Sequence, residues 1–445
     1  MYWANFLHIY QPPTQTREIL LKVTSESYRK ILAGLLENPQ AKLTLNISAC
    51  LTEMLAENDC LDVIENIRTL LTRGQLELTE SAKYHPLLPK LPESQIVRQI
   101  KLNHETNKKY FGDLYQPKGF FPPEMGYDSR LGKIIQGLGY EWIILDELAC
   151  PVPLNSTKIF VNRDGMKYFF RERETSFKIL SAQLGTAQSL TKEFGDRVEK
   201  NEYLLTAMDG ETFGHHRPGL EKLLTEIYKS SQIKTCLISD LPELFPDNLT
   251  VEPLASTWAL ISKENFKKNP FYRWDDAENP IHKKQWELTD LVLKLAESEG
   301  PEEQKLVDSA IYSDQYWWAS AKPWWSLEEI EKGAFGLLTA VRNFKNISKE
   351  TLEKAEDLYI DIITTGFEWQ RNGTVTALSR EEDEEIKART HEGNSYLSQT
   401  DFDQMIDTLE KQMLTAANDH EYLRAESFRK RIEELNDKNI IKVNE

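Results

Sequence analysis

The first 250 residues alternate short apolar strands with helical patterns, and this alternation constrains the fold more than any other feature. WANFLHIY (3–10) and KLTLNIS (42–48) are typical strands, and helical periodicity follows each of them. Such alternation indicates an α/β fold with a parallel sheet, either a β/α barrel or a doubly wound sheet. A hairpin is predicted at 158–172, turning at Asp164-Gly165.

Polar clusters lie where the predicted strands end. In a β/α barrel, the carboxyl ends of the strands carry the chemistry, so this placement favours a barrel with a single mouth. The clusters are His8 to Pro12, Glu77 to His85, Glu124, Asp146-Glu147 and Asp209 to His216.

After about residue 250 the sequence pattern changes from alternating strands and helices to long helices, and it indicates three further segments. Long helical patterns at 251–380 predict a helical domain that packs beside the barrel of residues 1–250 and contributes to its cleft. A polar, acidic linker is expected at 381–399. Residues 400–445 then predict a helical hairpin with its own apolar stripes.

Charge and composition limit the partners of this chain. Its 54 Lys and Arg against 71 Asp and Glu give a net charge of −17. Such a surface repels nucleic acid and anionic lipid, whereas neutral sugars are not disfavoured. No apolar run reaches the ~18 residues that span a bilayer, and the first residues lack the basic segment of a signal peptide. Four scattered cysteines indicate free thiols, so we expect a cytoplasmic protein with no nucleic-acid or membrane partner.

Two acidic residues at strand ends are the candidates for catalysis. Glu124 follows the rigid Pro122-Pro123 pair among aromatic residues, and Asp209 lies between an apolar strand and a glycine turn. Two carboxyl groups at one barrel mouth suit glycoside chemistry, in which one attacks the anomeric carbon and the other protonates the leaving oxygen. The sequence therefore favours an enzyme that acts on a glycosidic bond.

Residues that could hold a sugar surround these acids in the sequence. Histidine and glutamine can hydrogen-bond sugar hydroxyls, which makes His8 and Gln11 candidates, and Glu77 could orient His85. The run DQYWWASAKPWW (314–325) could close over the mouth, because the apolar faces of sugar rings stack on aromatic rings. The candidates for stacking in this run are Trp317, Trp318 and Trp324.

Two other functions stay open from the residues. His8, Asp209 and His216 could bind zinc in a polysaccharide deacetylase-like or mannosidase-like enzyme, although neither an HxH nor an HExxH spacing is present. Alternatively, the barrel could bind glucan without turnover and the tail could dock a partner. Neither a GxGxxG nor a GxxxxGK[ST] motif occurs, so we expect no nucleotide cofactor and, in the leading interpretation, no metal.

Taken in order, five motifs resemble the conserved regions of glycoside hydrolase family 57. They are HIYQPP (8–13), GQLELTESAKYHPLLP (74–89), GFFPPEMGY (119–127), AMDGETFGHH (207–216) and the DQYWWASAKPWW run. The resemblance covers about residues 1–370. It implies an incomplete (β/α)7 barrel followed by a helical domain, and a retaining α-glucan hydrolase or 4-α-glucanotransferase that acts on an α-glucan or maltooligosaccharide.

The resemblance also implies roles for individual residues. Glu124 matches the nucleophile and Asp209 the general acid/base. The positions around the sugar at the point of cleavage are matched by His8, Gln11, Glu77, His85, Glu211 and His216. The chain departs from the family pattern at Tyr10, where a second histidine is usual, and in the FFPPE lead-in to Glu124.

The C-terminal hairpin resembles a different module. LEKQMLTAANDHEYLRAESFRKRIEELN (409–436) is similar to the UVR hairpin of nucleotide-excision-repair subunits and some protease adaptors, in which it binds other proteins. A hairpin this short buries little surface by itself. We therefore expect residues 400–445 to dock on a partner or on a second copy of the chain, and turnover to be largely independent of them.

Overall fold

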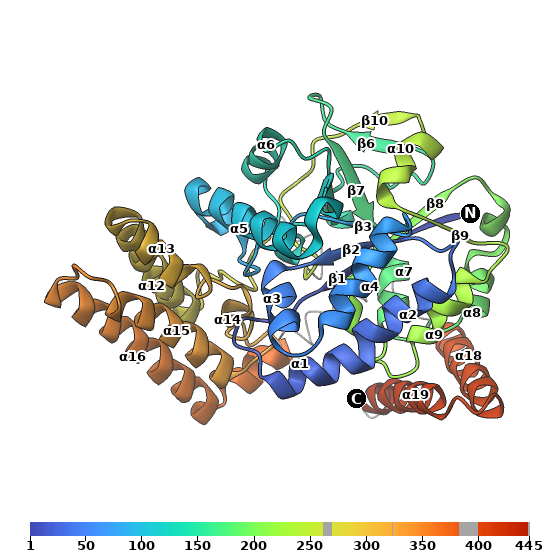
Figure 1. The fold of residues 1–445 in the computed structure, drawn as a ribbon. Coiled ribbons are helices and arrows are strands. Elements are labelled where there is room, and N and C mark those ends of the chain that lie inside the picture. Colours follow the sequence, from blue (N-terminus) through green and yellow to red (C-terminus); the bar gives the residue numbers. More distant parts are fainter. Residues whose placement is uncertain (261–268, 323, 382–398, 444–445) are drawn as a thin grey trace.

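The computed structural model describes residues 1–260, 269–322, 324–381 and 399–443. Three parts follow one another along the chain: the barrel, the helical region (residues 280–372) and the hairpin (residues 399–443). Figure 1 shows the helical region on the left of the barrel and the hairpin beside α9 at the lower right. The barrel therefore contacts both later parts.

Seven parallel strands within the described residues form the incomplete barrel, in the order β8-β1-β2-β3-β4-β5-β7. A bridge between Glu80 and Phe120 joins β3 to β4. On the open side, the Glu172 amide donates to the Leu205 carbonyl (2.8 Å), which holds β7 near β8. The strands are β1 Tyr2–Ile9, β2 Leu43–Ile47, β3 Leu76–Leu78, β4 Gly119–Phe120, β5 Trp142–Asp146, β7 Lys167–Arg171 and β8 Tyr203–Asp209, with β6 Ile159–Val161, β9 Lys234–Cys236 and β10 Asn248–Thr250 beside them.

Helices cover the outside of this sheet and form the two later parts. In the barrel they are α1 Arg17–Val23, α2 Arg29–Glu37, α3 Ala49–Glu57, α4 Leu61–Thr72, α5 Glu93–Phe111, α6 Ser129–Gly137, α7 Arg173–Leu180, α8 Ala187–Phe194, α9 Glu221–Tyr228 and α10 Leu241–Leu244. The helical region holds α12 Pro280–Glu299, α13 Pro301–Asp308, α14 Asp314–Trp317, α15 Leu327–Arg342 and α16 Lys349–Asn372. The hairpin is α18 Gln399–Asn418 and α19 Tyr422–Val443.

The local predictions hold where apolar periodicity is strong. The hairpin at 158–172 is confirmed, because β6 and β7 pair antiparallel. Helices α3 and α4 follow each other closely, separated by Asp59 in a left-handed conformation (φ 61°). Helices α7 and α8 were not predicted, because their short patterns lie between stronger strand signals.

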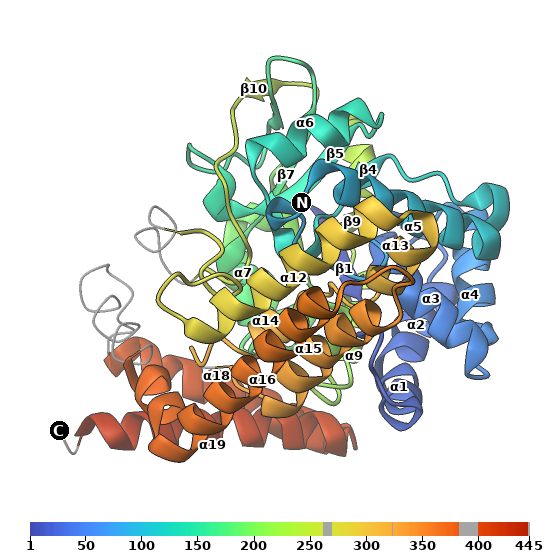
Figure 2. The same ribbon diagram turned by 90° about the vertical axis from the view of Figure 1, so that its left-hand side faces the viewer.

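One hydrophobic core fills the barrel interior, and a second joins the barrel to the helical region. Phe6, Phe121 and Phe169 fill the barrel interior, and β1 is buried along nearly its whole length. The outer face of β4 and β5 shares a second core with α12, in which Phe120 packs in one cluster with Leu288. Figure 2 shows α12, α15 and α16 stacked side by side against the barrel. The helical region is therefore anchored by burial of apolar surface.

The hairpin packs on the barrel of its own chain. Arg424 contacts Glu226 of α9, and Phe428 lies against Gly185, in the loop before α8. This intramolecular position differs from the expected docking on a partner or a second copy. Most of the predicted linker, 382–398, lies outside the described residues.

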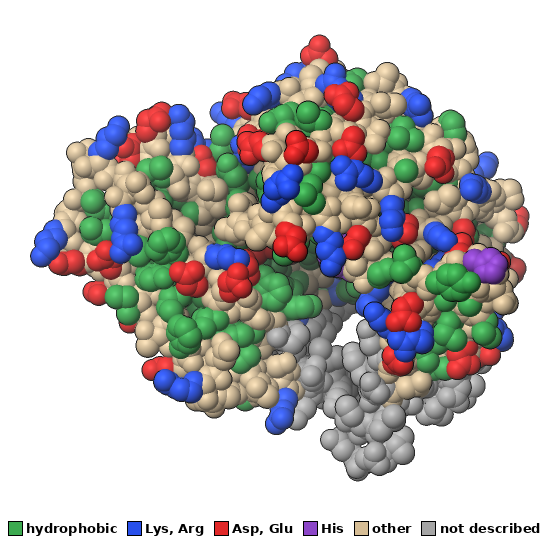
Figure 3. All heavy atoms as spheres, turned by 60° about the horizontal axis from the view of Figure 1, so that its bottom comes forward, with side chains coloured by type: hydrophobic (Ala, Val, Ile, Leu, Met, Phe, Trp, Pro, Cys, Tyr) green, Lys and Arg blue, Asp and Glu red, His purple; other side chains and the backbone are tan. Residues whose placement is uncertain are grey.

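The charged side chains on the surface and the state of the four cysteines can be compared with what the composition predicts. On the face shown in Figure 3, acidic and basic side chains are intermixed. Cys50, Cys60, Cys150 and Cys236 are free thiols, as predicted. None of the described helices is both long and apolar enough to cross a bilayer.

Candidate active site

Glu124 lies just beyond the end of β4, in a strained backbone conformation. Its φ of 60° is left-handed, and His85 (φ 54°) and Met125 (φ 47°) beside it are left-handed too. Such positions cost about 1–3 kcal/mol each and cluster at functional sites. The Trp258 indole N–H donates to the Glu124 carboxylate (2.8 Å), and the Trp258 amide donates to the Glu124 carbonyl (3.1 Å). Trp258 therefore fixes both the backbone and the side chain of Glu124.

Ser313 brings the helical region into the same site. Its hydroxyl donates to the Glu124 carboxylate (3.3 Å) and lies 3.0 Å from Nδ1 of His85. The Ser313 amide donates to the His85 carbonyl. The His85 ring stacks with Tyr10 (centroids 4.1 Å apart) and with His8 (5.0 Å), and these two rings also lie 5.9 Å from each other. One residue from the helical region thus links the nucleophile candidate to the aromatic stack at the end of β1.

Asp209 ends β8, directly beside His8 in the register of β1. Burial raises the pKa of Asp209 to about 6; the charge of Arg171 opposes this rise and that of Asp314 adds to it. Burial also raises the pKa of Glu124 to about 8, with the charges of Asp314 and Asp209 adding to the effect. Asp209 is therefore close enough to Glu124 for its charge to raise the pKa of Glu124.

Two further carboxyl groups complete the cluster. Asp314 accepts a hydrogen bond from the Tyr10 hydroxyl (2.8 Å), and burial raises its pKa to about 6. Glu211 accepts from Gln11 (3.3 Å) and from Tyr28, and burial together with the charge of Asp209 raises its pKa to about 7. We call Glu124, Asp209, Glu211 and Asp314 the mouth carboxylates.

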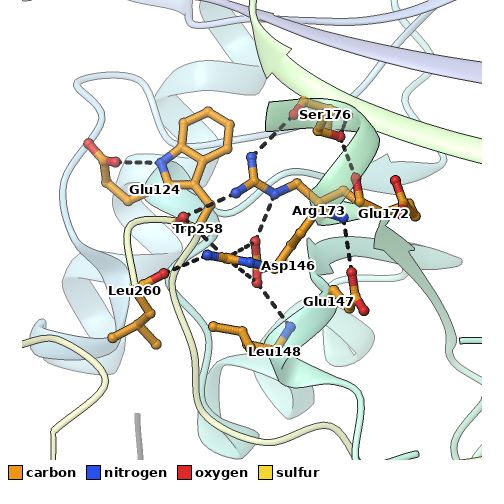
Figure 4. Close-up of polar contacts among 11 residues, drawn as sticks. Glu124, Asp146, Glu147, Leu148, Glu172, Arg173, Ser176, Trp258 and Leu260 are labelled. Atoms are coloured by element: carbon orange, nitrogen blue, oxygen red, sulfur yellow. Dashed lines mark hydrogen bonds and ion pairs between the residues drawn. The ribbon is translucent and has the colours of Figure 1, made fainter. Parts of the chain in front are cut away.

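Two arginines hold the Trp258 segment in place. Asp146, fully buried at the end of β5, pairs with Arg171 (2.7 Å) and Arg173 (2.8 Å). Arg171 donates to the Trp258 carbonyl, and Arg173 donates to the Leu260 carbonyl. Figure 4 shows these bonds running from Asp146 through Arg173 to Trp258 and on to Glu124. The arginines thereby position the indole that binds the nucleophile candidate.

A pocket of about 470 Å³ opens beside Asp209, within the size range of small-molecule sites. Trp258, Trp317 and Trp324 form aromatic walls, and Trp324 is 44% exposed. Leu180 and Phe177 of α7 line the opposite part. An acidic group beside apolar aromatic faces is an arrangement that can bind a sugar ring and act on it.

The structure brings most of the predicted residues together, but not all. Glu211 is itself one of the mouth carboxylates, and His8, Gln11 and His85 lie around them through the contacts described above. Trp318 packs edge-on against Trp324 instead of lining the pocket.

Glu77 and His216 lie differently from what was expected. Glu77 accepts from Thr44 (2.7 Å) and from the Ser239 amide, at a register position toward the amino ends of the strands. The idea that Glu77 orients His85 is therefore wrong, since Ser313 does so. His216 is exposed in the loop after Asp209.

The zinc hypothesis has little support in this arrangement. Nδ1 of His8 bonds Asn46 (2.8 Å), while the His216 ring packs against His215. No group of three or more His, Cys, Asp or Glu side chains suited to a metal occurs in the part of the chain that the structure describes. The donor set proposed for zinc, His8 with Asp209 and His216, is thus not gathered.

Four functional residues escaped the sequence analysis: Trp258, Ser313, Asp314 and Arg171. Trp258 lies outside the five motifs, and Ser313 and Asp314 precede the tryptophans that drew attention to their segment. Arg171 ends a strand, as Asp209 does, and strand-end position was the one signal that could have found it.

Comparisons with known proteins agree with this geometry. The chain matches the sequence model of glycosyl hydrolase family 57 over residues 4–252. An alpha-amylase of Pyrococcus abyssi and a 4-alpha-glucanotransferase of Thermococcus litoralis are each 23% identical over 368 residues, covering 70% of this chain and 53% of the relative. The chain therefore spans about half the length of these relatives.

Solved structures share the fold. The 4-alpha-glucanotransferase of Thermococcus litoralis matches with a TM-score of 0.61 and 18% identity, covering 78% of this chain and 59% of that one. A GH57-type branching enzyme of Pyrococcus horikoshii also has a TM-score of 0.61, with 16% identity and coverage of 81% and 96%. The incomplete (β/α)7 barrel with its helical region is thus confirmed, and because the family model matches more than half of the sequence, the chain belongs to glycosyl hydrolase family 57.

Proposed function

We propose that this protein is a retaining α-glucan hydrolase or 4-α-glucanotransferase, with Glu124 as the nucleophile and Asp209 as the general acid/base. The observation that carries the proposal is the placement of Glu124. It is a largely buried carboxylate (15% exposed) on strained backbone, held by Trp258 and Ser313, and the charge of Asp209 raises its pKa. The substrates in the names of the relatives support an α-glucan.

The reaction takes two steps in this arrangement. A Glu124 oxygen attacks the anomeric carbon while the glycosidic bond breaks, and Asp209 gives its proton to the leaving oxygen. The product is a glycosyl ester on Glu124. Asp209, now ionised, takes a proton from water or from an acceptor sugar, whose oxygen attacks the anomeric carbon and releases Glu124.

Bound substrate has to change the protonation of the pair. In the free protein the pKa of Glu124, about 8, exceeds that of Asp209, about 6, which is the reverse of what the roles require. Positive charge develops at the anomeric carbon during attack and favours an ionised Glu124. The glycosidic oxygen beside Asp209 accepts a proton, which favours the neutral acid. We therefore propose that substrate binding moves a proton from Glu124 to Asp209.

The aromatic pocket bears on the choice between water and a sugar acceptor. Trp317 and Trp324 stack with their centroids 5.6 Å apart and border the same pocket as Asp209. A glucose ring bound there would exclude water from the glycosyl ester, and transfer would then compete with hydrolysis. We propose that these walls form the acceptor side of the cleft.

We also propose that the protein acts in the cytoplasm and that its C-terminal hairpin binds another protein. Four free thiols support a reducing cytoplasm. The resemblance of the hairpin to UVR modules supports a protein-binding role for its outer surface, where Tyr422 (67%) and Leu423 (66%) are exposed.

Product analysis tests the proposed activity. The purified chain is incubated separately with maltoheptaose and with amylose, and the products are separated by chromatography while NMR follows the anomeric configuration. We expect α-configured products first, together with a ladder of shorter oligosaccharides or of both shorter and longer ones. Initial release of β-anomers, or unchanged substrates at high enzyme concentration, would contradict the proposal.

A further inference from the structure

The loop that follows Asp209 is held from two sides. Residues 210–220 connect β8 to α9 and contain Glu211. On one side, Nδ1 of His215 lies 2.6 Å from Glu26, and the Ser27 hydroxyl donates to the Gly210 carbonyl (2.8 Å). On the other side, the loop meets the C-terminal hairpin at Gly219.

Two glycines form the seat of the hairpin. Gly219 has a φ of 91°, and a Cβ atom there would lie 2.5 Å from the Arg424 Cα. A Cβ atom on Gly185 would lie 2.5 Å from the Phe428 ring. Because real Cβ contacts are not this short, any side chain at either position would displace the hairpin. The barrel surface therefore accommodates the hairpin through two residues that lack side chains.

Arg424 ties the two loops of this seat together. Its side chain is 5% exposed; it donates to Glu226 and to the Gly185 carbonyl. Glu226 in turn accepts from the Ala187 amide (2.8 Å), and Lys222 pairs with Glu421 at the edge (2.7 Å). A buried, charge-assisted bond of this kind is strong and directional. Arg424 thus fixes the loop before α8 and the loop before α9 relative to each other.

A short path leads from this seat to the pocket. Two residues before Gly219, Arg217 donates to the Leu180 carbonyl (3.3 Å). Leu180 lines the pocket together with Asp209. The loop seated by the hairpin therefore supports a wall of the pocket through one hydrogen bond, and it carries Glu211 at its other end.

We infer that the C-terminal hairpin is an intramolecular brace on the Asp209 side of the active site. Its docking surface is the patch formed by Gly185, Gly219, Lys222 and Glu226, and its function is to hold residues 210–220 and the Leu180 wall. This inference rests on the proposed function only for its effect on glucan turnover. It replaces the expectation that turnover is independent of the hairpin.

The full-length chain with Arg424→Glu tests the brace, and Arg429→Glu is its matched control. Both substitutions reverse one charge on α19, but Arg429 bridges Glu426 and Glu433 on the exposed side of the hairpin. Hydrogen exchange is measured over residues 181–187, 210–220 and 119–126. We expect Arg424→Glu to raise exchange at least tenfold in the first two segments while 119–126 is unchanged, and Arg429→Glu to leave all three as in the parent chain.

A second variant and an activity measurement complete the test. Phe428→Ala loosens the hairpin without a charge change and should raise exchange in the same segments by a smaller factor. For Arg424→Glu we expect kcat/KM on maltoheptaose to fall about tenfold, with a changed ratio of transfer to hydrolysis. That ratio would not respond to a purely structural role.

Three results would overturn the brace. In the first, the hairpin is released from the barrel, but hydrogen exchange in residues 210–220 and the ratio of transfer to hydrolysis do not change. In the second, the residues around Gly185 and Gly219 already exchange fast in the parent chain. In the third, the protein forms a concentration-dependent dimer in which each hairpin packs on the barrel of the other chain. If the parent chain acts on no glucan, the proposed function fails, and the exchange measurements still decide the brace.

Discussion

Buried carboxylates occur in two settings in this molecule. Asp146 is paired with two arginines, and Glu80, also fully buried, accepts from Asn103, Tyr115, Tyr140 and His104. Glu124 and Asp314, among the mouth carboxylates, accept fewer such bonds, from Trp258 and Ser313 and from Tyr10, and they lie near other carboxyl groups. Burial without a matching cation raises the pKa of a carboxyl group, as it does for Glu124 and Asp209. The difference separates carboxylates that hold the fold from those that can exchange protons with a substrate.

Neutralising the nucleophile tests one side of this contrast most strongly. Glu124→Gln should fold normally, because burial already favours its uncharged form, yet it cannot form the glycosyl ester. We expect turnover of maltoheptaose to fall on the order of 10⁴-fold or more. Steady-state kinetics and a thermal melt measure the two properties. A variant that keeps most of the activity would refute the assignment.

Neutralising Asp209 should give a selective loss. Asp209→Asn removes the acid, so we expect roughly 10²–10⁴-fold slower cleavage of natural glucans. Cleavage of an aryl glucoside with a good leaving group should fall far less in its first step, since that step needs no proton. Pre-steady-state release of the aryl group measures it. Equal losses on both substrates would contradict the acid/base role.

Neutralising the structural carboxylate Asp146 should lower the stability of the fold. Asp146→Asn leaves Arg171 and Arg173 without their buried counter-ion, and breaking such a pair costs about 3–5 kcal/mol of the free energy of unfolding. Urea denaturation measures this change, with Asp164→Asn in the exposed β6–β7 turn as the control. If the free energy of unfolding falls by less than about 1 kcal/mol, Asp146 does not stabilise the fold as this comparison requires.

Removing the charge of Asp314, which acts on both Glu124 and Asp209, should shift the pH profile of kcat/KM. The negative charge of Asp314 raises the pKa of both Glu124 and Asp209, so Asp314→Asn should lower both. The two limbs of the kcat/KM profile report the two pKa values of the pair in the free protein, so both limbs should move to lower pH, by about half to one unit. Asp357→Asn on the exposed face of α16 is the control. Unmoved limbs, or a shift to higher pH, would exclude this coupling.

The sequence predicted the parts of the site that lie on barrel strands. Asp209 and His8 stand at the ends of long apolar runs, so their shared edge follows from strand periodicity alone. Periodicity could not place Trp258 or Ser313, because neither lies on a strand and both reach Glu124 through contacts between segments more than 100 residues apart. Glu77 shows the opposite error: a polar residue in a buried strand lies below the mouth and satisfies structural donors.

The seat of the hairpin was also beyond sequence reasoning. Its apolar residues and short length predicted docking on a partner or a second copy, whereas the hairpin packs on its own barrel. The glycines that form that surface, Gly185 and Gly219, have no pattern of their own, and their meaning depends on what approaches them.

The hydrogen bonds of Glu124 have a consequence for the order in which the enzyme matures. Both side chains that donate to its carboxylate, those of Trp258 and Ser313, follow the barrel strands in the chain. Chains emerge from the ribosome amino terminus first, and domains tend to fold in that order. A nascent barrel that ends at β8 would therefore hold Asp209 but lack both donors to Glu124. Under the proposed function, turnover then begins only when the helical region has been synthesised and has docked, so translation itself delays the first catalytic cycle.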